Sequence, residues 1–221
     1  MNELRTLQVD YPYFVSHPQE GYGMYLLSRL PLVDPTVRHL VDEHIPSIET
    51  GVKLSSGATF RFYGLHPAPP PLKDTARRDA ELIIVAREAK ALQEPVIVAG
   101  DLNDVAWSRT THLFQKVSGL LDPRIGRGFF STFSADWKLL RWPLDHVFFD
   151  QAFLLLDLRV LDNIGSDHFP LYIELCHKPV AGQRQEAPDA DPQDRADASK
   201  AIEAGRDKAA AAGSSAAQPQ T

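Results

Sequence analysis

The chain has 221 residues, a formal net charge of −6 at pH 7 and a hydrophobic fraction of 43%, values typical of one well-buried domain with or without a tail. A single cysteine, Cys176, excludes a scaffold held by intrachain disulfides. No run approaches the roughly 18 apolar residues of a membrane span, and no export signal is visible, so we expect a cytoplasmic chain as given. The acidic balance weakly disfavours extensive contact with nucleic-acid backbones.

The first part of the sequence predicts mainly strands. Residues 1–20 show little periodicity and predict a short helix or an irregular segment, and residues 22–28 predict a strand that Pro31 ends. Residues 48–54 and 59–65 predict a β-hairpin around the Ser-Ser-Gly turn. Its second strand ends at His66, where a cluster of prolines forces an extended loop.

The middle of the chain predicts alternating helices and strands. Residues 74–92 predict a helix capped by Asp74, with one buried face made of Ala80, Ile83, Ile84, Arg87 and Ala91. The apolar run of residues 95–100 predicts a strand buried on both faces. A helix over about 108–117, a loop over 122–142 and strands over 144–149, 152–160 and 169–175 follow.

The end of the chain differs in composition. Residues 178–221 contain no aromatic residue and few aliphatic residues apart from alanine, so we predict a disordered tail in which residues 198–212 are transiently helical. The folded domain is therefore predicted to span residues 1–177. Its order of elements is a mixed α/β pattern and favours a layered sandwich.

Polar side chains follow or precede four of the predicted strands. They are His66, the group Asp101, Asn103 and Asp104, the pair Asp145 and His146, and the triplet Ser166, Asp167 and His168. Each group alone is explained as readily by turns and caps, because Asp, Asn and Ser are ordinary turn residues. Four strand ends that all present His or Asp favour a shared site, because sheet proteins tend to place chemistry there.

Four segments, YGLHPAPP, VIVAGDLND, PLDHVFF and IGSDHFPL, together resemble the endonuclease/exonuclease/phosphatase superfamily. The segment GYGMYLLSRLPL is also similar to the family's strand before a Ser-Arg/Lys-hydrophobe-Pro turn, and the resemblance covers about residues 10–176. It implies a DNase I-like fold, an α/β four-layer αββα sandwich. It also implies metal-dependent hydrolysis of phosphodiester or phosphomonoester bonds with Mg²⁺ or Mn²⁺.

The resemblance assigns roles to individual residues. His168 is the central histidine, and Asp145 accepts a hydrogen bond from its ring, which fixes the tautomer and raises the pKa of His168. Asp101 orients the attacking water, Asn103 holds a phosphate oxygen, and His66 donates a hydrogen bond to the phosphate. The metal ligands it implies are Asp101, Asn103 and Asp167. For His146, packing and catalysis both stay open.

A basic and aromatic segment lies in the predicted loop over 122–142. We predict that it binds the substrate through Arg124, Arg127, Trp137, Lys138 and Arg141. Cations beside tryptophans suit single-stranded nucleic acid or a phospholipid headgroup, and a small phosphate ester is the third possibility. Ordinary packing is the alternative for Trp137 and Trp142. No protein partner is implied, and we expect a monomer.

The sequence also departs from the family pattern. Family members have an N-terminal strand with an Asn and a second strand ending in a Gln-Glu pair whose Glu binds the metal, and neither precedes residue 10. Glu20 is expected to be a solvent-facing loop residue. The chain as given is therefore expected to be an N-terminally truncated, partial domain with weak, metal-insensitive activity. The competing hypothesis is a non-catalytic remnant that acts as a binding module or is inactive.

Overall fold

The structure is a computed structural model that describes residues 2–70, 74–137, 140–179 and 186–216. Lys138, predicted to bind substrate, lies outside these ranges. The elements are, in chain order, α1 (Asn2–Asp10), β1 (Tyr13–His17), β2 (Met24–Ser28), β3 (Leu32–Arg38), β4 (Ser47–Lys53), β5 (Thr59–Gly64), α2 (Ala76–Ala91), β6 (Val96–Asp101), α3 (Arg109–Ser118), β7 (Asp145–Phe149), β8 (Phe153–Val160), β9 (Leu171–His177) and α4 (Pro192–Ala216).

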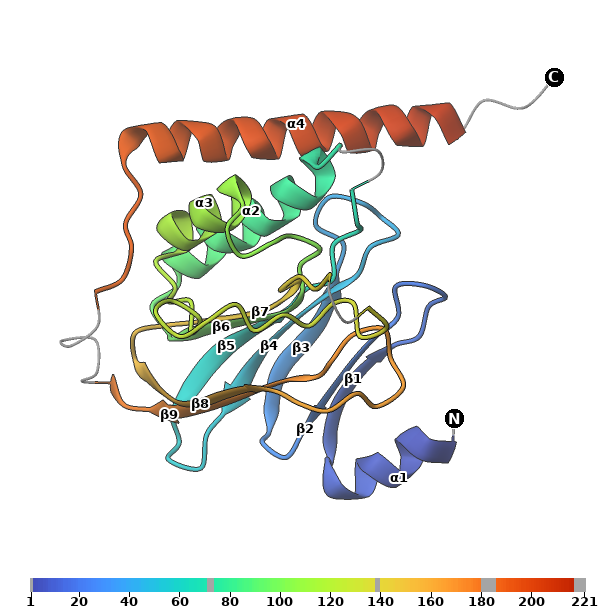
Figure 1. The fold of residues 1–221 in the computed structure, drawn as a ribbon, viewed down its shortest axis with the longest axis vertical. Coiled ribbons are helices and arrows are strands. Elements are labelled where there is room, and N and C mark those ends of the chain that lie inside the picture. The colour runs from blue at the N-terminus through green and yellow to red at the C-terminus, as the bar shows by residue number, and fades with distance from the viewer. Residues whose placement is uncertain (1, 71–73, 138–139, 180–185, 217–221) are drawn as a thin grey trace.

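The centre of the molecule is a five-stranded sheet in the order β3-β4-β5-β6-β7. Strands β5 and β6 run parallel, whereas the other neighbours are antiparallel. Helices α2 and α3 lie on one side of this sheet and the β8–β9 pair lies on the other side (Figure 1). The fold is therefore mixed α/β, as the order of elements predicted, with the predicted hairpin as β4 and β5.

The main core lies between the helices and the sheet. Val96 and Val98 of β6 are at most 1% exposed and pack in one cluster with residues of α2 and α3. Phe114 of α3 and Phe148 of β7 stack with their ring centroids 4.8 Å apart. Strand β6 is the predicted apolar strand, but it is fully buried on one face only, because Ile97 and Ala99 on the other face are half-buried. Among the described helices, none combines the length and the apolar character needed to cross a bilayer.

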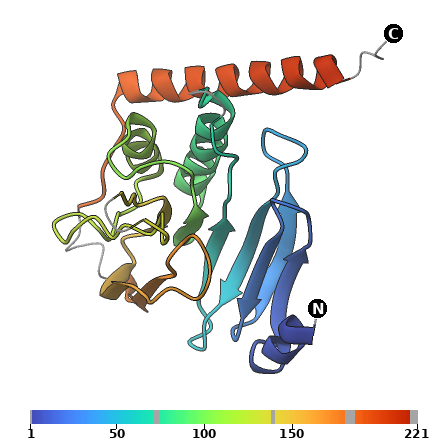
Figure 2. The ribbon, with the colours of Figure 1, turned by 45° about the vertical axis from the view of Figure 1, so that its right-hand side comes forward.

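Helix α4 contradicts the prediction of disorder over residues 192–216. It lies on the outer side of α2 and α3, away from the sheet (Figure 2). Ala198 and Ile202 are buried in the main core, and Lys116 of α3 binds Asp194 at 3.0 Å. A Cβ atom on Gly205 would lie 2.2 Å from the Cβ of Ala80, so α4 and α2 approach closely through small side chains.

The error has a physical reason. The tail lacks large apolar residues, which predicted disorder, but an interface of alanine and glycine buries helix surface without them. Because α4 covers α2, the latter is buried on more than the one face predicted, and Arg87 binds Ser199 at 2.6 Å instead of facing the core. The domain boundary at residue 177 stays a prediction.

Two strands were missed by the sequence analysis. Strand β1 pairs with β2, where an irregular segment was predicted. Strand β3 contains Pro35 at an irregularity between Val33 and Thr36, and proline is usual in strands only at edges and bulges. The cap of α2 is Thr75 and not Asp74, although Asp74 Oδ1 accepts a hydrogen bond from the amide of Ala76 at 3.3 Å.

Candidate functional site

The register of the central sheet brings three of the four predicted polar groups together. Gly64 of β5 lies beside Ala99 of the parallel strand β6, so His66, two residues further on, follows the course of Asp101. Asp101 is the partner of Asp145 in the antiparallel pair of β6 and β7. The strand ends therefore place one histidine and two aspartates at the same edge.

Gly100 allows β5 and β6 to approach closely at this edge. Its φ is +147°, and a Cβ atom there would lie 1.9 Å from the carbonyl oxygen of Leu65. That oxygen belongs to the residue before His66. A side chain at position 100 would push the His66 strand away from Asp101, so glycine is required by packing as well as by the backbone conformation.

The fourth group, His168, joins the site from the loop before β9. Its Nδ1 lies 2.7 Å from Asp145 Oδ2, and its Nε2 lies 3.7 Å from Asp101 Oδ2. The Nε2 of His66 lies 3.8 Å from the same Asp101 oxygen. Side chains of all four are 18–33% exposed, so they are shielded but reachable from solvent. Asp101 is thus flanked by two imidazoles, and Asp145 supports one of them.

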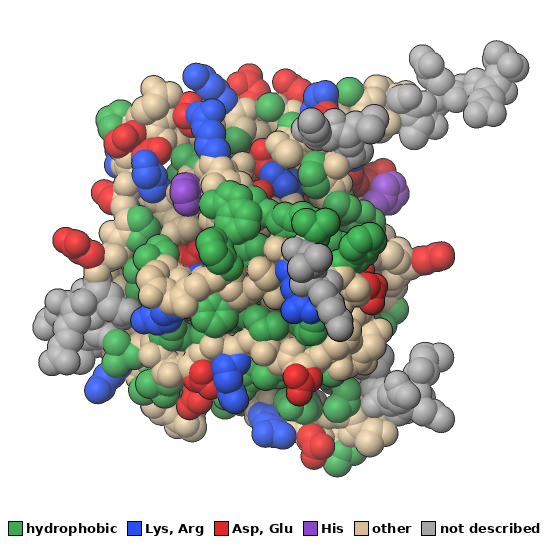
Figure 3. All heavy atoms as spheres, in the orientation of Figure 1, with side chains coloured by type: hydrophobic (Ala, Val, Ile, Leu, Met, Phe, Trp, Pro, Cys, Tyr) green, Lys and Arg blue, Asp and Glu red, His purple; other side chains and the backbone are tan. Residues whose placement is uncertain are grey.

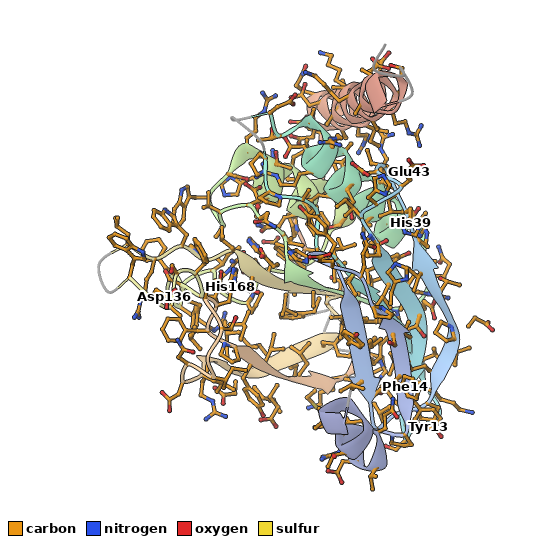
Figure 4. All side chains as sticks on the ribbon, turned by 90° about the vertical axis from the view of Figure 1, so that its right-hand side faces the viewer. Tyr13, Phe14, His39, Glu43, Asp136 and His168 are labelled. Carbon is orange, nitrogen blue, oxygen red and sulfur yellow. The ribbon has the colours of Figure 1, made fainter. Side chains whose placement is uncertain are left out.

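The segment before β7 holds the His168 loop in place. Ala135 donates its amide proton to the carbonyl of Asp167 at 2.7 Å, and the ring of Phe133 lies 4.9 Å from the ring of His168. The hydroxyl of Thr132 accepts the amide proton of Asp145 at 3.2 Å. Figure 4 shows His168 and Asp136 on the same side of the molecule, away from β1. No sequence motif pointed to Thr132 or Phe133.

The surroundings of His168 and Asp101 shift the pKa of each side chain. Burial opposes the charged form of His168, but the hydrogen bond and charge of Asp145 outweigh it and raise the pKa of the imidazole above 6.5. Burial raises the pKa of Asp101, although a hydrogen bond from the Asn103 amide acts in the opposite direction. The charged form of His168 is therefore favoured, whereas the charged form of Asp101 is disfavoured. Nδ1 of His168 donates to Asp145, and Nε2 faces Asp101.

The proposed metal ligands form an incomplete set. The side chain of Asn103 is held by its Nδ2, which donates to the carbonyl of Pro67 at 2.9 Å. Asp167 is exposed, and its Oδ1 accepts from Ser166 at 3.4 Å. In the described ranges, no three His, Cys, Asp or Glu side chains are grouped to hold an ion. Oxygens of Asp101 and Asn103 suit a hard, largely hydrated cation but do not close a cage around it.

His146 takes no part in the cluster. It is 1% exposed, its Nε2 lies 2.8 Å from the carbonyl oxygen of Asp104, and its Nδ1 lies 2.7 Å from Nη2 of Arg124. Burial and then the charge of Arg124 lower its pKa to about 3. Neutral His146 therefore donates from Nε2 and accepts at Nδ1. The open question about this residue is answered by a buried structural role.

The predicted substrate-binding residues do not form one patch. Arg124 is 6% exposed and pairs with Asp122 at 2.7 Å, so it lies inside the protein and not on its surface. Sequence composition alone did not reveal this buried partner. Arg127 is exposed but bonds to its own turn. Arg141 donates from Nε to the carbonyl of Trp137 at 3.2 Å and lies over the Phe169 ring, beside His168.

Tyr22 lies beside His66, whereas Glu20, two residues earlier in the chain, is exposed. Tyr22 has its ring 5.6 Å from the ring of His66 and lines the approach to it, although no motif pointed to this tyrosine. Glu20 lies exposed in a turn, as expected. Five residues were expected to converge, and the structure brings four of the side chains together: His66, Asp101, Asp145 and His168. The fifth residue, Asn103, contacts Asp101 through its backbone amide, but its side chain binds the carbonyl of Pro67.

Comparisons with known proteins identify the family and the fold. A model described as Endonuclease/Exonuclease/phosphatase family matches residues 1–168. The fold is similar to humanized D. rerio TDP2, with a TM-score of 0.66, 16% identity and 79% and 80% of the two chains covered.

Two proteins of Bacteroides thetaiotaomicron are similar in fold as well. An endonuclease/exonuclease/phosphatase family protein has a TM-score of 0.62 and 20% identity, with 79% of each chain covered. A mannosyl-6-phosphatase has a TM-score of 0.61 and 18% identity, with 79% and 81% covered. A search of curated proteins finds no significant match.

Proposed function

Because the chain belongs to the endonuclease/exonuclease/phosphatase family, we propose that it is a hydrolase of phosphoester bonds. One observation carries the proposal, namely the run of contacts from Asp145 through His168 to Asp101, with His66 on the far side of Asp101. A carboxylate that orients a histidine, and that histidine facing a second carboxylate, are the parts that general acid–base chemistry needs.

The proposed reaction is the attack of water on the phosphorus atom. Asp101 accepts a proton of the attacking water, the new P–O bond forms, and the P–O bond to the leaving group breaks. Protonated His168 donates a hydrogen bond to a phosphate oxygen, where negative charge develops, and the ring N–H of His66 donates another. Asp145 keeps the His168 ring oriented and stabilises its charged form.

We propose Mg²⁺ or Mn²⁺ as the cofactor, held by Asp101, Asn103 and Asp167. When bound, the ion neutralises charge on the phosphate. The incomplete donor set of the described residues predicts weak binding, because Mg²⁺ is held well only where carboxylates replace part of its hydration shell. We therefore expect activity to be half-maximal at a millimolar concentration of the ion, which distinguishes this site from a closed metal cage.

The finer features of the family are proposals too. We propose the four-layer αββα sandwich for the fold, supported by helices on one side of the central sheet and the β8–β9 pair on the other. The substrate is a phosphoester of nucleic acid, of a phospholipid headgroup or of a small molecule. Similar structures include TDP2 complexed with single strand DNA product and a mannosyl-6-phosphatase, which supports this range. Arg127, Trp137 and Arg141 stay as proposed contacts, and the protein is proposed to be a monomer.

The test is hydrolysis of bis-p-nitrophenyl phosphate, a soluble phosphodiester, across a titration of Mg²⁺ and Mn²⁺. We expect Asp101→Asn to lower the rate at least ~10²-fold, as expected for loss of a general base. Asp150→Asn, at the opposite end of β7, is the matched control and should keep the wild-type rate. Equal rates in wild type and Asp101→Asn would overturn the proposal.

A binding module without catalysis is the second candidate. The observation that favours it is the lack of a three-residue ligand cluster among the described side chains. It predicts no turnover at any metal concentration, together with retained binding of inorganic phosphate measured by calorimetry. The same titration therefore decides between the two functions.

A further inference from the structure

Large hydrophobic side chains gather on the loops around the site. Six of them are between 37% and 71% exposed and are here called the apolar row: Trp107, Ile125, Phe129, Trp137, Leu140 and Trp142. Figure 3 shows hydrophobic side chains gathered in the middle of one face of the molecule. Exposed apolar surface that is contiguous, and not scattered, marks a site of interaction.

Contacts within the row connect it to the catalytic residues. At one end, Trp107 meets Phe129 edge-on with ring centroids 5.7 Å apart, and both line a hollow of about 400 Å³ with Ile125. At the other end, Trp142 lies 6.4 Å from the ring of Phe133, which in turn lies 4.9 Å from His168. The end of the row at Trp142 is therefore separated from His168 by one aromatic ring, that of Phe133.

We infer that the apolar row docks on the surface of a zwitterionic phospholipid bilayer, so that the phosphoester reaching His168 belongs to a lipid headgroup. This rests on the proposed function and narrows its substrate class. Ile125 and Leu140 present aliphatic tips that can enter the acyl boundary, while tryptophans favour the level of the headgroups.

Charges at the edge of the row fit such a surface. Arg141 is exposed beside Trp137, and Arg127 is exposed in the turn that carries Ile125 and Phe129. The carboxylate of Asp136 is exposed next to Trp137. Side chains of both signs complement a headgroup that carries a phosphate and a quaternary amine.

Single-stranded nucleic acid fits the row less well. Such a ligand needs a cationic groove along its backbone, with aromatic side chains under its bases. The net charge of the chain is −6, and Arg124 is buried in an ion pair with Asp122. The aliphatic members of the row, Ile125 and Leu140, offer no face for base stacking. Oligonucleotide binding is therefore an outcome that would contradict the inference.

The experiment is sedimentation of the protein with sucrose-loaded vesicles of phosphatidylcholine, without any substrate or metal. We expect the wild type to partition onto the vesicles. The variants Leu140→Ser and Phe129→Ser should each lower the partition coefficient about tenfold, since each removes a large apolar side chain from the buried interface. Phe14→Ser and Leu156→Ser change side chains of 46% and 58% exposure on β1 and β8, and should stay within about twofold of wild type.

The results separate the docking surface from the chemistry. Wild type that stays in the supernatant at millimolar lipid, or control variants that lose as much binding as Leu140→Ser, would overturn the inference. Binding of a single-stranded oligonucleotide that the same two row variants abolish would overturn it as well. Hydrolysis of soluble bis-p-nitrophenyl phosphate should be unchanged in Leu140→Ser and Phe129→Ser. If vesicles bind but that substrate is never cleaved, the proposed function fails and the docking surface stands.

Discussion

His168 and His146 follow aspartates in similar dipeptides, yet the protein puts them in opposite states. His168 is half-buried between Asp145 and Asp101, which favours its charged form. His146 is enclosed beside Arg124, which favours its neutral form. Contacts from other elements, and not the dipeptide itself, therefore decide whether each histidine takes part in the candidate site or has a structural role.

The geometry of β7 explains why the neighbours Asp145 and His146 contact different partners. Successive side chains of β7 point to opposite faces, so Asp145 and His146 cannot serve the same cluster. The carboxylate of Asp145 turns to His168, which is 23 residues away in sequence, whereas His146 turns inward to Asp104 and Arg124. Adjacent positions of β7 therefore hold Asp145, which orients His168, and His146, which has a structural role.

The largest effect is expected on turnover, when the aspartate that supports His168 is changed. Asp145→Asn removes the charge that orients and stabilises the imidazolium, and loss of such a carboxylate can cost ~10³–10⁴-fold in turnover. The fold should stay intact, because the amide still fills the same space. Steady-state hydrolysis of bis-p-nitrophenyl phosphate and circular dichroism measure the two parts.

Asp150→Asn is the matched control for this change. Asp150 lies just after β7 and accepts a hydrogen bond from the amide of Ala152 at 2.8 Å, so it has a similar turn role at the far end of the strand. It should keep wild-type turnover. Unchanged turnover in Asp145→Asn would show that this aspartate is only a strand-start residue.

The second effect falls on the His146 side and on stability. Arg124→Met leaves Asp122, whose side chain is 4% exposed, without its counter-charge. Breaking a buried pair in this way typically costs 3–5 kcal/mol, while replacing both charges is far milder. Urea unfolding should therefore show a large loss for Arg124→Met and a partial recovery in Asp122→Asn with Arg124→Met.

The exposed pair of Arg159 and Asp157 provides the control for that measurement. The two side chains are 58% and 37% exposed, and exposed pairs contribute at most about 1 kcal/mol. Arg159→Met should thus change the free energy of unfolding little. If it costs as much as Arg124→Met, burial is not what distinguishes the His146 network.

The third prediction concerns the pH dependence of stability, which should differ between the two histidines. The folded-state pKa of His168 is raised, so its contribution to stability is complete below about pH 6.5 and is lost as pH rises through the raised value. The folded-state pKa of His146 is lowered to about 3, so stability falls as pH drops from about 6.5 toward 3. His168→Gln should flatten the alkaline side of the stability curve, and His146→Gln the acidic side.

The slope of each limb is expected to reach at most ~1.4 kcal/mol per pH unit, the value for one proton. Urea unfolding between pH 4 and 9 measures both limbs. If the two glutamine variants lose the same limb, the opposite assignments for the two histidines are wrong.

The sequence predicted the parts of this comparison that are local. The apolar run of β6 and the polar groups at strand ends led to Asp101, Asp145 and His168. Contacts set by distant elements were not visible: Arg124 pairs with the nearby Asp122, but it is the contact with His146 of β7, 22 residues away, that places Arg124 inside the protein. The same limit hid α4, whose alanines bury well only because α2 presents Ala80 opposite Gly205.

The smallest effect is expected for Ser108, which contacts Asp104, the residue whose carbonyl binds His146. Ser108 caps α3, and its Oγ accepts the amide proton of Thr111 at 2.9 Å and donates to the carboxylate of Asp104. Ser108→Ala should cost about 1 kcal/mol, typical of a lost helix cap. For a chain of this size, that loss lowers Tm by about 2–4 °C, which differential scanning calorimetry resolves.

The cap is informative because it acts on one histidine only. Asp104 keeps hydrogen bonds from Thr111 Oγ1 at 3.0 Å and an ion pair with Arg78 at 3.3 Å, so its carbonyl stays in place for His146. Turnover and its pH profile in Ser108→Ala should therefore match the wild type. The control Ser214→Ala, on the exposed face of α4, should leave both Tm and turnover unchanged. A shifted pH–rate profile in Ser108→Ala would mean that the scaffold around His146 reaches the protonation of His168, and the two regions would then have to be treated as one coupled network.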